Sequence, residues 1–239
     1  MEDREWSDNS FGLMPSILVA SHELKSPLSL IRQYGLLLAD DSLTRIEVEQ
    51  IQQNIVQVSD SALGLVSDLA CVANLQPSLF PLEPVHISAL IQQVSGEVHP
   101  HSTCQSRRIS WPSSRQSNQL IVGNRVLLGR ILSNFLVNSM KYNGKDEVPI
   151  QVSAKRIGDN VRLGVRDHGP AMELGEYSRL VDELEQKKTI KSRPESSGLG
   201  VYVSSQFARA MGGAIGLTRH RDGLTFYVDM PVSNQLSLV

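Results

Sequence analysis

The strongest constraint on the fold is an apolar repeat in residues 44–72, where the spacing alternates between four and three residues. Its members are Ile51, Ile55, Val58, Ala62, Leu65, Leu69 and Val72. This is the spacing of a helix that packs its a and d positions against another helix. Residues 15–39 carry a similar seam, and the polar run Asp40-Asp41-Ser42 separates the two stretches. The sequence therefore predicts an antiparallel helical hairpin, with Pro15 in the first turn of its first helix.

A single hairpin leaves one flank of each seam uncovered. We therefore predict a homodimer in which two hairpins form a four-helix bundle. The alternative is a monomer whose hairpin folds onto the second half of the same chain.

One histidine of the first helix lies away from the seam. When the heptads are counted from Ile17, His22 takes the f position, which is the farthest from a and d. Glu23 follows it directly, and a carboxylate that bonds one ring nitrogen makes the other a better nucleophile. His22 is thus a candidate nucleophile, and the alternative is an ordinary solvated histidine.

Composition and charge exclude several classes of function. Hydrophobic residues make up 41% and charged residues 20%, as in globular proteins. A net charge of -2 without a long basic run disfavours nucleic acid and anionic membranes as partners. Cys71 and Cys104 lack the spacing of a zinc site or a disulfide framework. With no run of about 18 apolar residues, we expect a cytoplasmic location.

A change of pattern after the hairpin predicts a second domain. Residues 76–84 contain three prolines and are predicted to be a linker. The expected strands are residues 85–87, 108–111, 119–122, 148–154, 161–166, 214–218 and 224–230, with helices from Ser88, from Asn124 and through residues 198–211. Residues 172–196 are highly charged and are predicted to be a mobile solvated lid. The second domain is therefore predicted to be an α+β sandwich, with helices on one face of a mostly antiparallel sheet.

The helix after Asn124 carries polar residues on one face. They are Asn134, Asn138, Lys141 and Tyr142. Amide oxygens can complete the ligand shell of a magnesium ion that also holds phosphates, and a lysine adds positive charge there. Asparagines on a helix are also often merely solvated.

Two further segments have the composition of a nucleotide site. Asp167-His168-Gly169-Pro170-Ala171 follows a predicted strand, where a carboxylate can accept a hydrogen bond from an exocyclic amine such as that of adenine. Ser196-Ser197-Gly198-Leu199-Gly200 opens a helix, and its glycines let backbone amides approach phosphates. Each segment alone is also compatible with an ordinary turn.

Four segments, which begin at His22, Asn134, Asp167 and Gly198, resemble the ordered boxes of the two-component sensor histidine kinases. The resemblance extends over about residues 14–232. The resemblance implies a tail in residues 1–13, an all-α dimerising and phosphoacceptor hairpin in residues 14–75, and a linker in residues 76–84. An α/β sandwich of the Bergerat (GHKL) type would follow in residues 85–234 and bind ATP and Mg²⁺.

The resemblance also implies a role for each matching residue. His22 would accept the γ-phosphoryl group of ATP, with Glu23 as its activator, and Ser26 is a candidate for phosphatase activity. The implied ATP-binding residues are Asn134, Asn138, Lys141, Tyr142, Asp167, Gly169, Gly198, Leu199 and Gly200, of which Asn138 would bind Mg²⁺. Related ATPases such as gyrase place a glutamate where this chain has Asn134, which favours transfer over hydrolysis.

Three departures from the family pattern leave alternatives open. Ala171 replaces the second glycine of its box, no phenylalanine-containing box follows, and Ser26 stands where phosphatases of the family carry threonine or asparagine. The alternatives are a pseudokinase that acts as a dimeric scaffold, and a phosphatase of the regulator. The expected partners are a second copy and the receiver domain of a response regulator. Nucleic acid is not an expected partner, and a membrane link is expected only through segments outside this chain.

Overall fold

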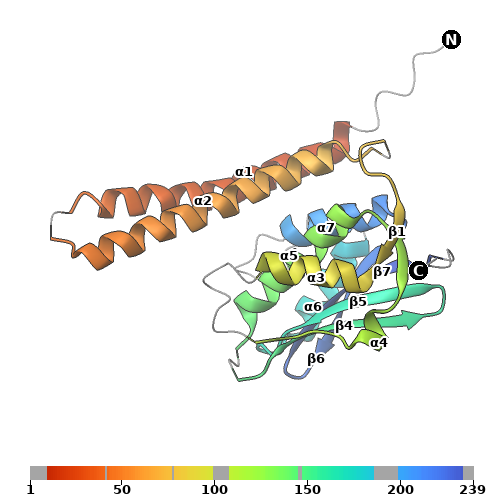
Figure 1. Ribbon diagram of the computed structural model, residues 1–239. Coiled ribbons are helices and arrows are strands. Elements are labelled where there is room, and N and C mark those ends of the chain that lie inside the picture. The colour runs from red at the N-terminus through yellow and green to blue at the C-terminus, as the bar shows by residue number, and fades with distance from the viewer. Residues whose placement is uncertain are drawn as a thin grey trace, which may run out of the picture. The chain divides into compact units, whose positions relative to one another are not determined.

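The computed structural model describes residues 10–40, 42–76, 78–98, 108–144, 147–185 and 199–233. The chain divides into two compact units, Met1–Asn74 and Leu75–Val239 (Figure 1). The two units are described separately below.

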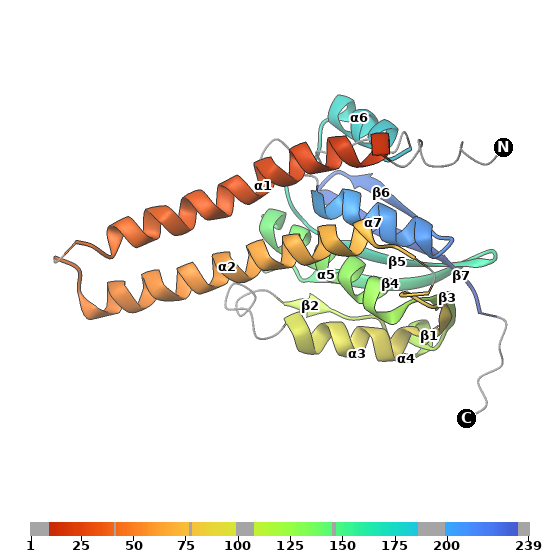
Figure 2. The same cartoon turned by 90° about the horizontal axis from the view of Figure 1, so that it is seen from above.

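The first unit is a hairpin of two long helices, α1 (Ser10–Leu37) and α2 (Arg45–Ala73), which lie side by side (Figure 2). A capping box begins α2: the Thr44 amide donates to Glu47 Oε2 at 2.8 Å, and the Glu47 amide donates to Thr44 Oγ1 at 3.4 Å. Because α1 begins at Ser10, the prediction that Pro15 lies in its first turn is wrong.

The hairpin leaves large apolar side chains exposed. Val56 and Leu63 on α2 expose 60% and 67% of their surface, and Leu28 and Leu36 on α1 expose 59% and 61%. Among the described residues, α2 alone has the length and apolar composition of a helix that could cross a membrane. A helix that packs against partner helices passes the same test, so this is weak evidence for a membrane span.

The second unit is built on a five-stranded sheet with the order β2-β4-β5-β7-β6. The strands are β2 (Ile109–Ser110), β4 (Ile150–Ile157), β5 (Asn160–Arg166), β6 (Ala214–His220) and β7 (Gly223–Pro231). Only the β2–β4 pair is parallel. β1 (Glu83–His86) pairs separately with β3 (Leu120–Gly123), so the end of the predicted linker belongs to a strand.

Helices cover one face of the large sheet. They are α3 (Ile87–Val98), α5 (Arg125–Tyr142) and α7 (Leu199–Ala210), and Figure 1 shows them together above the strands. Between the layers the rings of Phe135 and Phe226 stack with their centroids 5.6 Å apart. The predicted α+β sandwich is confirmed.

Two helices were not predicted from the sequence. α4 (Ser114–Ser117) is a single turn, and α6 (Leu174–Glu185) lies in the segment that we predicted to be a lid. Leu180 and Leu184 are buried one turn apart on α6, but charged residues surround them in the sequence. Residues 186–198 lie outside the described part of the chain.

Candidate functional site

The polar helix α5 is fixed at its N-terminus by Asn124. The Oδ1 atom of Asn124 accepts hydrogen bonds from the amides of Val126 and Leu127 at 3.1 and 3.2 Å. Its Nδ2 atom donates to the carbonyl of Pro81 at 3.1 Å. The same side chain therefore caps α5 and holds the chain that enters β1.

The middle of α5 faces the first turn of α7. The Asn134 amide nitrogen lies 3.4 Å from both the Gly200 carbonyl oxygen and the Ser204 hydroxyl. Asn138 follows one turn later and is half-buried. Among the described residues its side chain makes no hydrogen bond, so its amide oxygen is available to a ligand. A hard oxygen donor of this kind fits Mg²⁺, which takes few protein ligands and completes its shell with phosphates and water.

The C-terminal end of α5 contacts the loop after β5. A Cβ atom on Gly169 would lie 2.2 Å from the carbonyl oxygen of Tyr142, so only glycine permits this approach. The Nζ atom of Lys141 lies 5.2 Å from the centre of the Tyr142 ring, a cation–π contact. The structure thus brings together three residues that the sequence assigned to one site.

The Asp167 carboxylate is held in one orientation and buried, with 2% of the residue exposed. Its Oδ1 atom accepts hydrogen bonds from the amides of Gly169 and Leu224 at 3.0 and 3.2 Å. The Asp167 amide itself donates to the Leu224 carbonyl at 3.0 Å. Within the described ranges, Oδ2 accepts no hydrogen bond. One carboxylate oxygen is therefore fixed by the backbone and the other is open to a donor from a ligand.

Two residues that support Asp167 and its loop were missed in the sequence. Gly223 has φ +129°, and a Cβ atom there would lie 2.2 Å from the Asp167 carbonyl oxygen. Asn143 is 4% exposed, and its Oδ1 atom accepts the His168 amide at 2.8 Å. The sequence placed Gly223 only in the connection between the strands predicted at 214–218 and 224–230. The pairing of β5 with β7, which makes it a neighbour of Asp167, is not visible in the sequence.

Several predicted residues do not enter this geometry. Leu199 is fully buried at the start of α7, whereas Gly198 lies outside the described residues. His22 and Glu23 lie within α1, in the other unit, but their side chains are outside the described set. Ser26 lies one turn later on α1 and is exposed.

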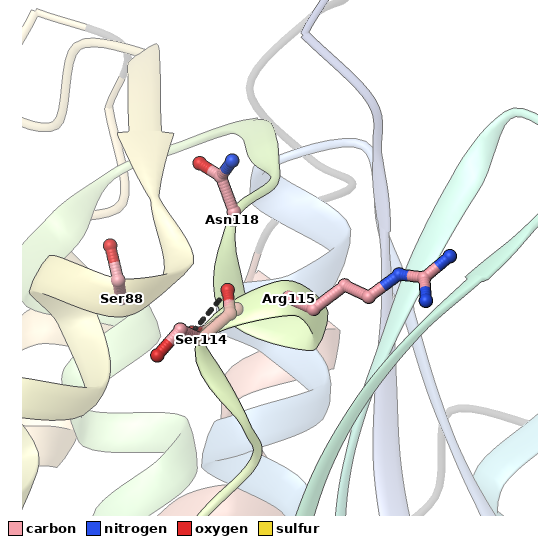
Figure 3. A pocket seen from close by; sticks show the side chains of 5 residues that line it. Ser88, Ser114, Arg115 and Asn118 are labelled. Carbon is pink, nitrogen blue, oxygen red and sulfur yellow. Dashed lines mark hydrogen bonds between the residues drawn. The ribbon is translucent and has the colours of Figure 1, made fainter.

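A surface depression elsewhere in the second unit is lined by Ser88, Ser114, Arg115, Ser117 and Asn118 (Figure 3). The Arg115 side chain points away from Ser88 and Asn118. In the described ranges, no group of three or more His, Cys, Asp or Glu residues is arranged to hold a metal ion.

Comparison with known proteins identifies relatives of both the ATPase domain and the longer chain. Residues 123–234 match the family model of histidine kinase-, DNA gyrase B- and HSP90-like ATPases. The sensor protein CutS of Streptomyces coelicolor is 26% identical over 215 residues, which cover 89% of this chain and 51% of that protein. The chain thus spans about half the length of CutS.

Solved histidine kinases share the fold. The histidine kinase AdeS of Acinetobacter baumannii superposes with a TM-score of 0.62 at 16% identity, over 89% of this chain and 98% of that one. Full-length ShkA in complex with AMPPNP gives a TM-score of 0.61 at 25% identity, over 95% of this chain and 47% of that one.

Proposed function

Because the chain belongs to the two-component sensor histidine kinases and carries their GHKL ATPase domain, we propose that its second unit binds ATP and phosphorylates His22. The phosphoryl group would then pass to an aspartate on the receiver domain of a response regulator. We propose that both units of the chain act in the cytoplasm.

The observation that carries this proposal is the geometry of Asp167. Its buried carboxylate accepts two backbone amides on Oδ1 and leaves Oδ2 without a donor among the described residues. The exocyclic amine of adenine would donate to Oδ2, which explains why the backbone fixes this carboxylate. The complex of ShkA with AMPPNP, an ATP analogue, supports the choice of nucleotide.

The phosphates would lie along the polar face of α5. Asn138 would hold Mg²⁺ through its amide oxygen, and the ion would neutralise charge on the phosphates when bound. Lys141 is exposed beyond it on the same helix and would add a positive charge. Asn134 would act indirectly, because its amide contacts Gly200 and Ser204 at the start of α7.

The transfer step is a displacement at the γ-phosphorus. A ring nitrogen of His22 would form a bond to phosphorus while the bond to the β–γ bridging oxygen breaks, and ADP would leave. Glu23 would accept the proton that the phosphorylated ring releases. Positioning supplies most of the rate in such a reaction, so the linker would have to let His22 meet the γ-phosphate in line. The flexible part of the linker would precede Pro81, whose carbonyl is bonded to Asn124.

A second copy of the chain is the proposed partner of the hairpin. The exposed apolar residues of α1 and α2 would be covered in a four-helix bundle, where burial stabilises by about 25 cal/mol per Å² of apolar surface.

The test is incubation of the full chain with γ-labelled ATP and Mg²⁺. We expect acid-labile, alkali-stable label on the wild type and on the control His86→Gln, and none on His22→Gln. Label that persists in His22→Gln would assign the acceptor elsewhere. Nucleotide binding without label on any variant would instead identify a pseudokinase, which the replacement of glycine by Ala171 makes the main alternative.

A further inference from the structure

The two chain neighbours of Asp167 are bonded to a single carboxylate in the β6–β7 turn. The Arg166 guanidinium donates to Asp222 Oδ1 at 2.8 Å, and the Nδ1 atom of His168 lies 3.2 Å from Asp222 Oδ2. We propose that His168 is a positioning residue that sets the base specificity of the nucleotide site by acting through Asp222. The proposal rests on the proposed function, in which Asp167 reads the base.

The connection between His168 and Asp167 runs through the turn. Asp222 precedes Gly223, which packs against the Asp167 carbonyl, and Leu224, whose amide donates to Asp167 Oδ1 at 3.2 Å. The contact between His168 and Asp222 therefore joins the residue after Asp167 to the segment that orients its carboxylate. If this contact is lost, Arg166 still holds Asp222 Oδ1, but the turn loses its bond to the residue that follows Asp167, and we expect the direction of Oδ2 to change.

Burial makes this contact more effective than a surface pair. The His168 side chain is only 9% exposed, although Asp222 is 43% exposed. The His168 backbone is fixed as well, because its amide donates to Asn143 Oδ1 at 2.8 Å. The backbone of His168 and the Nδ1 atom of its ring are thus both held. The ring therefore restrains the turn that carries Asp222.

The ring acts through one nitrogen. Because Asp222 accepts a hydrogen bond, the Nδ1 atom of His168 carries the proton. The Nε2 atom is buried and has no hydrogen-bond partner among the described residues. An asparagine amide nitrogen is as many bonds from the backbone as Nδ1, whereas the glutamine amide is one carbon further out. The variant His168→Asn should therefore keep the contact with Asp222, and His168→Gln should lose it.

The expected effect is on recognition of the base. A carboxylate that turns away loses its bond to the adenine amine, but the contacts with the phosphates remain. Purine riboside triphosphate, which lacks the amine, should then bind as well as ATP. A general loss of structure would weaken both triphosphates equally, so the ratio of their dissociation constants separates the two effects.

The experiment measures both dissociation constants by calorimetry on the full chain. We expect wild type and His168→Asn to prefer ATP by at least about tenfold, because hydrogen bonds to charged groups are among the strong ones. His168→Gln and Asp222→Ala should reduce the preference to near unity. Asp159→Ala, which removes an exposed carboxylate from the β4–β5 turn, is the matched control and should keep the preference.

Three results would overturn the proposal. One is a wild-type preference for ATP that His168→Gln and Asp222→Ala retain. Another is loss of the preference for ATP in His168→Asn, because the contact of Nδ1 with Asp222 would then not be what positions Asp167. The third is equal binding of both triphosphates by the wild type, because no base reading would exist to be positioned. If His168→Gln does not fold, Asp222→Ala in the partly exposed turn decides. Failure of the wild type to bind any nucleotide would count against the proposed function itself.

Discussion

Replacing Gly223 with alanine should displace the Asp167 carboxylate, which we propose reads the base. The added Cβ atom would lie 2.2 Å from the Asp167 carbonyl oxygen and 2.7 Å from its Oδ1 atom. Cβ atoms essentially never approach other heavy atoms more closely than 3.0 Å, so the segments that contain Gly223 and Asp167 must separate by about 0.8 Å. The φ angle of +129° at Gly223 adds conformational strain, because side chains are rarely tolerated there.

The size of the effect follows from the bonds that such a shift would break. The Asp167 amide donates to the Leu224 carbonyl at 3.0 Å, and the Leu224 amide donates to Asp167 Oδ1 at 3.2 Å. Each hydrogen bond contributes about 0.5 to 1.5 kcal/mol, and the strained backbone costs about 1 to 3 kcal/mol. We expect the free energy of unfolding to fall by about 2 to 6 kcal/mol. ATP affinity should fall by at least about tenfold, since the carboxylate also loses its orientation.

Urea unfolding and calorimetric ATP binding measure the two effects. Gly158→Ala is the control, because Gly158 has φ +58° but no heavy atom within 4 Å of an added Cβ. It should lose only about 1 to 2 kcal/mol of stability, the cost of a left-handed residue, and keep its ATP affinity. The reasoning is refuted if Gly223→Ala binds ATP as tightly as Gly158→Ala.

Asn124→Ala removes the cap of α5 and the bond to Pro81, and should lower the free energy of unfolding by about 1 to 2 kcal/mol. Calorimetry would contradict this if the melting temperature did not change. Thr44→Ala breaks the capping box with Glu47 and should cost the hairpin about 0.5 to 2 kcal/mol. Circular dichroism should show the loss, with ATP affinity unchanged. Burial is the main cause that lowers the pKa of His220 from its usual 6.5, and the positive charge of Arg166 is the second. The unfolded chain therefore binds that proton more tightly, and stability should fall as the pH drops below about 6.5. His220→Gln should flatten this dependence in urea titrations; an unchanged slope would argue against it.

The helical elements could be predicted where apolar spacing alone determines them. The alternating seam and Thr44 placed α2 to within about one residue of its observed start. α6 was missed because its two buried leucines, Leu180 and Leu184, are surrounded by charged residues in the sequence. Such a helix owes its position to packing against the sheet, which local periodicity does not encode.

The site could be predicted only where one segment carries the chemistry. Asp167 and Gly169 follow a strand in a recognisable order. The roles of His168 and Gly223 depend instead on the antiparallel pairing that places Arg166 opposite Thr225. That register brings the β6–β7 turn against Asp167, and a sequence without tertiary contacts does not show it.

The described hydrogen bonds also hold together segments that are far apart in the sequence. Asn134 reaches Gly200 across 66 positions, and Asn143 reaches His168 across 25. At the other end of the same helix, Asn124 reaches Pro81 across 43 positions. The buried face of α5 is fixed by core packing, so these polar groups at its two ends and on its other face have fixed positions. A single rigid helix therefore sets the spacing between the loop that holds Asp167 and the first turn of α7.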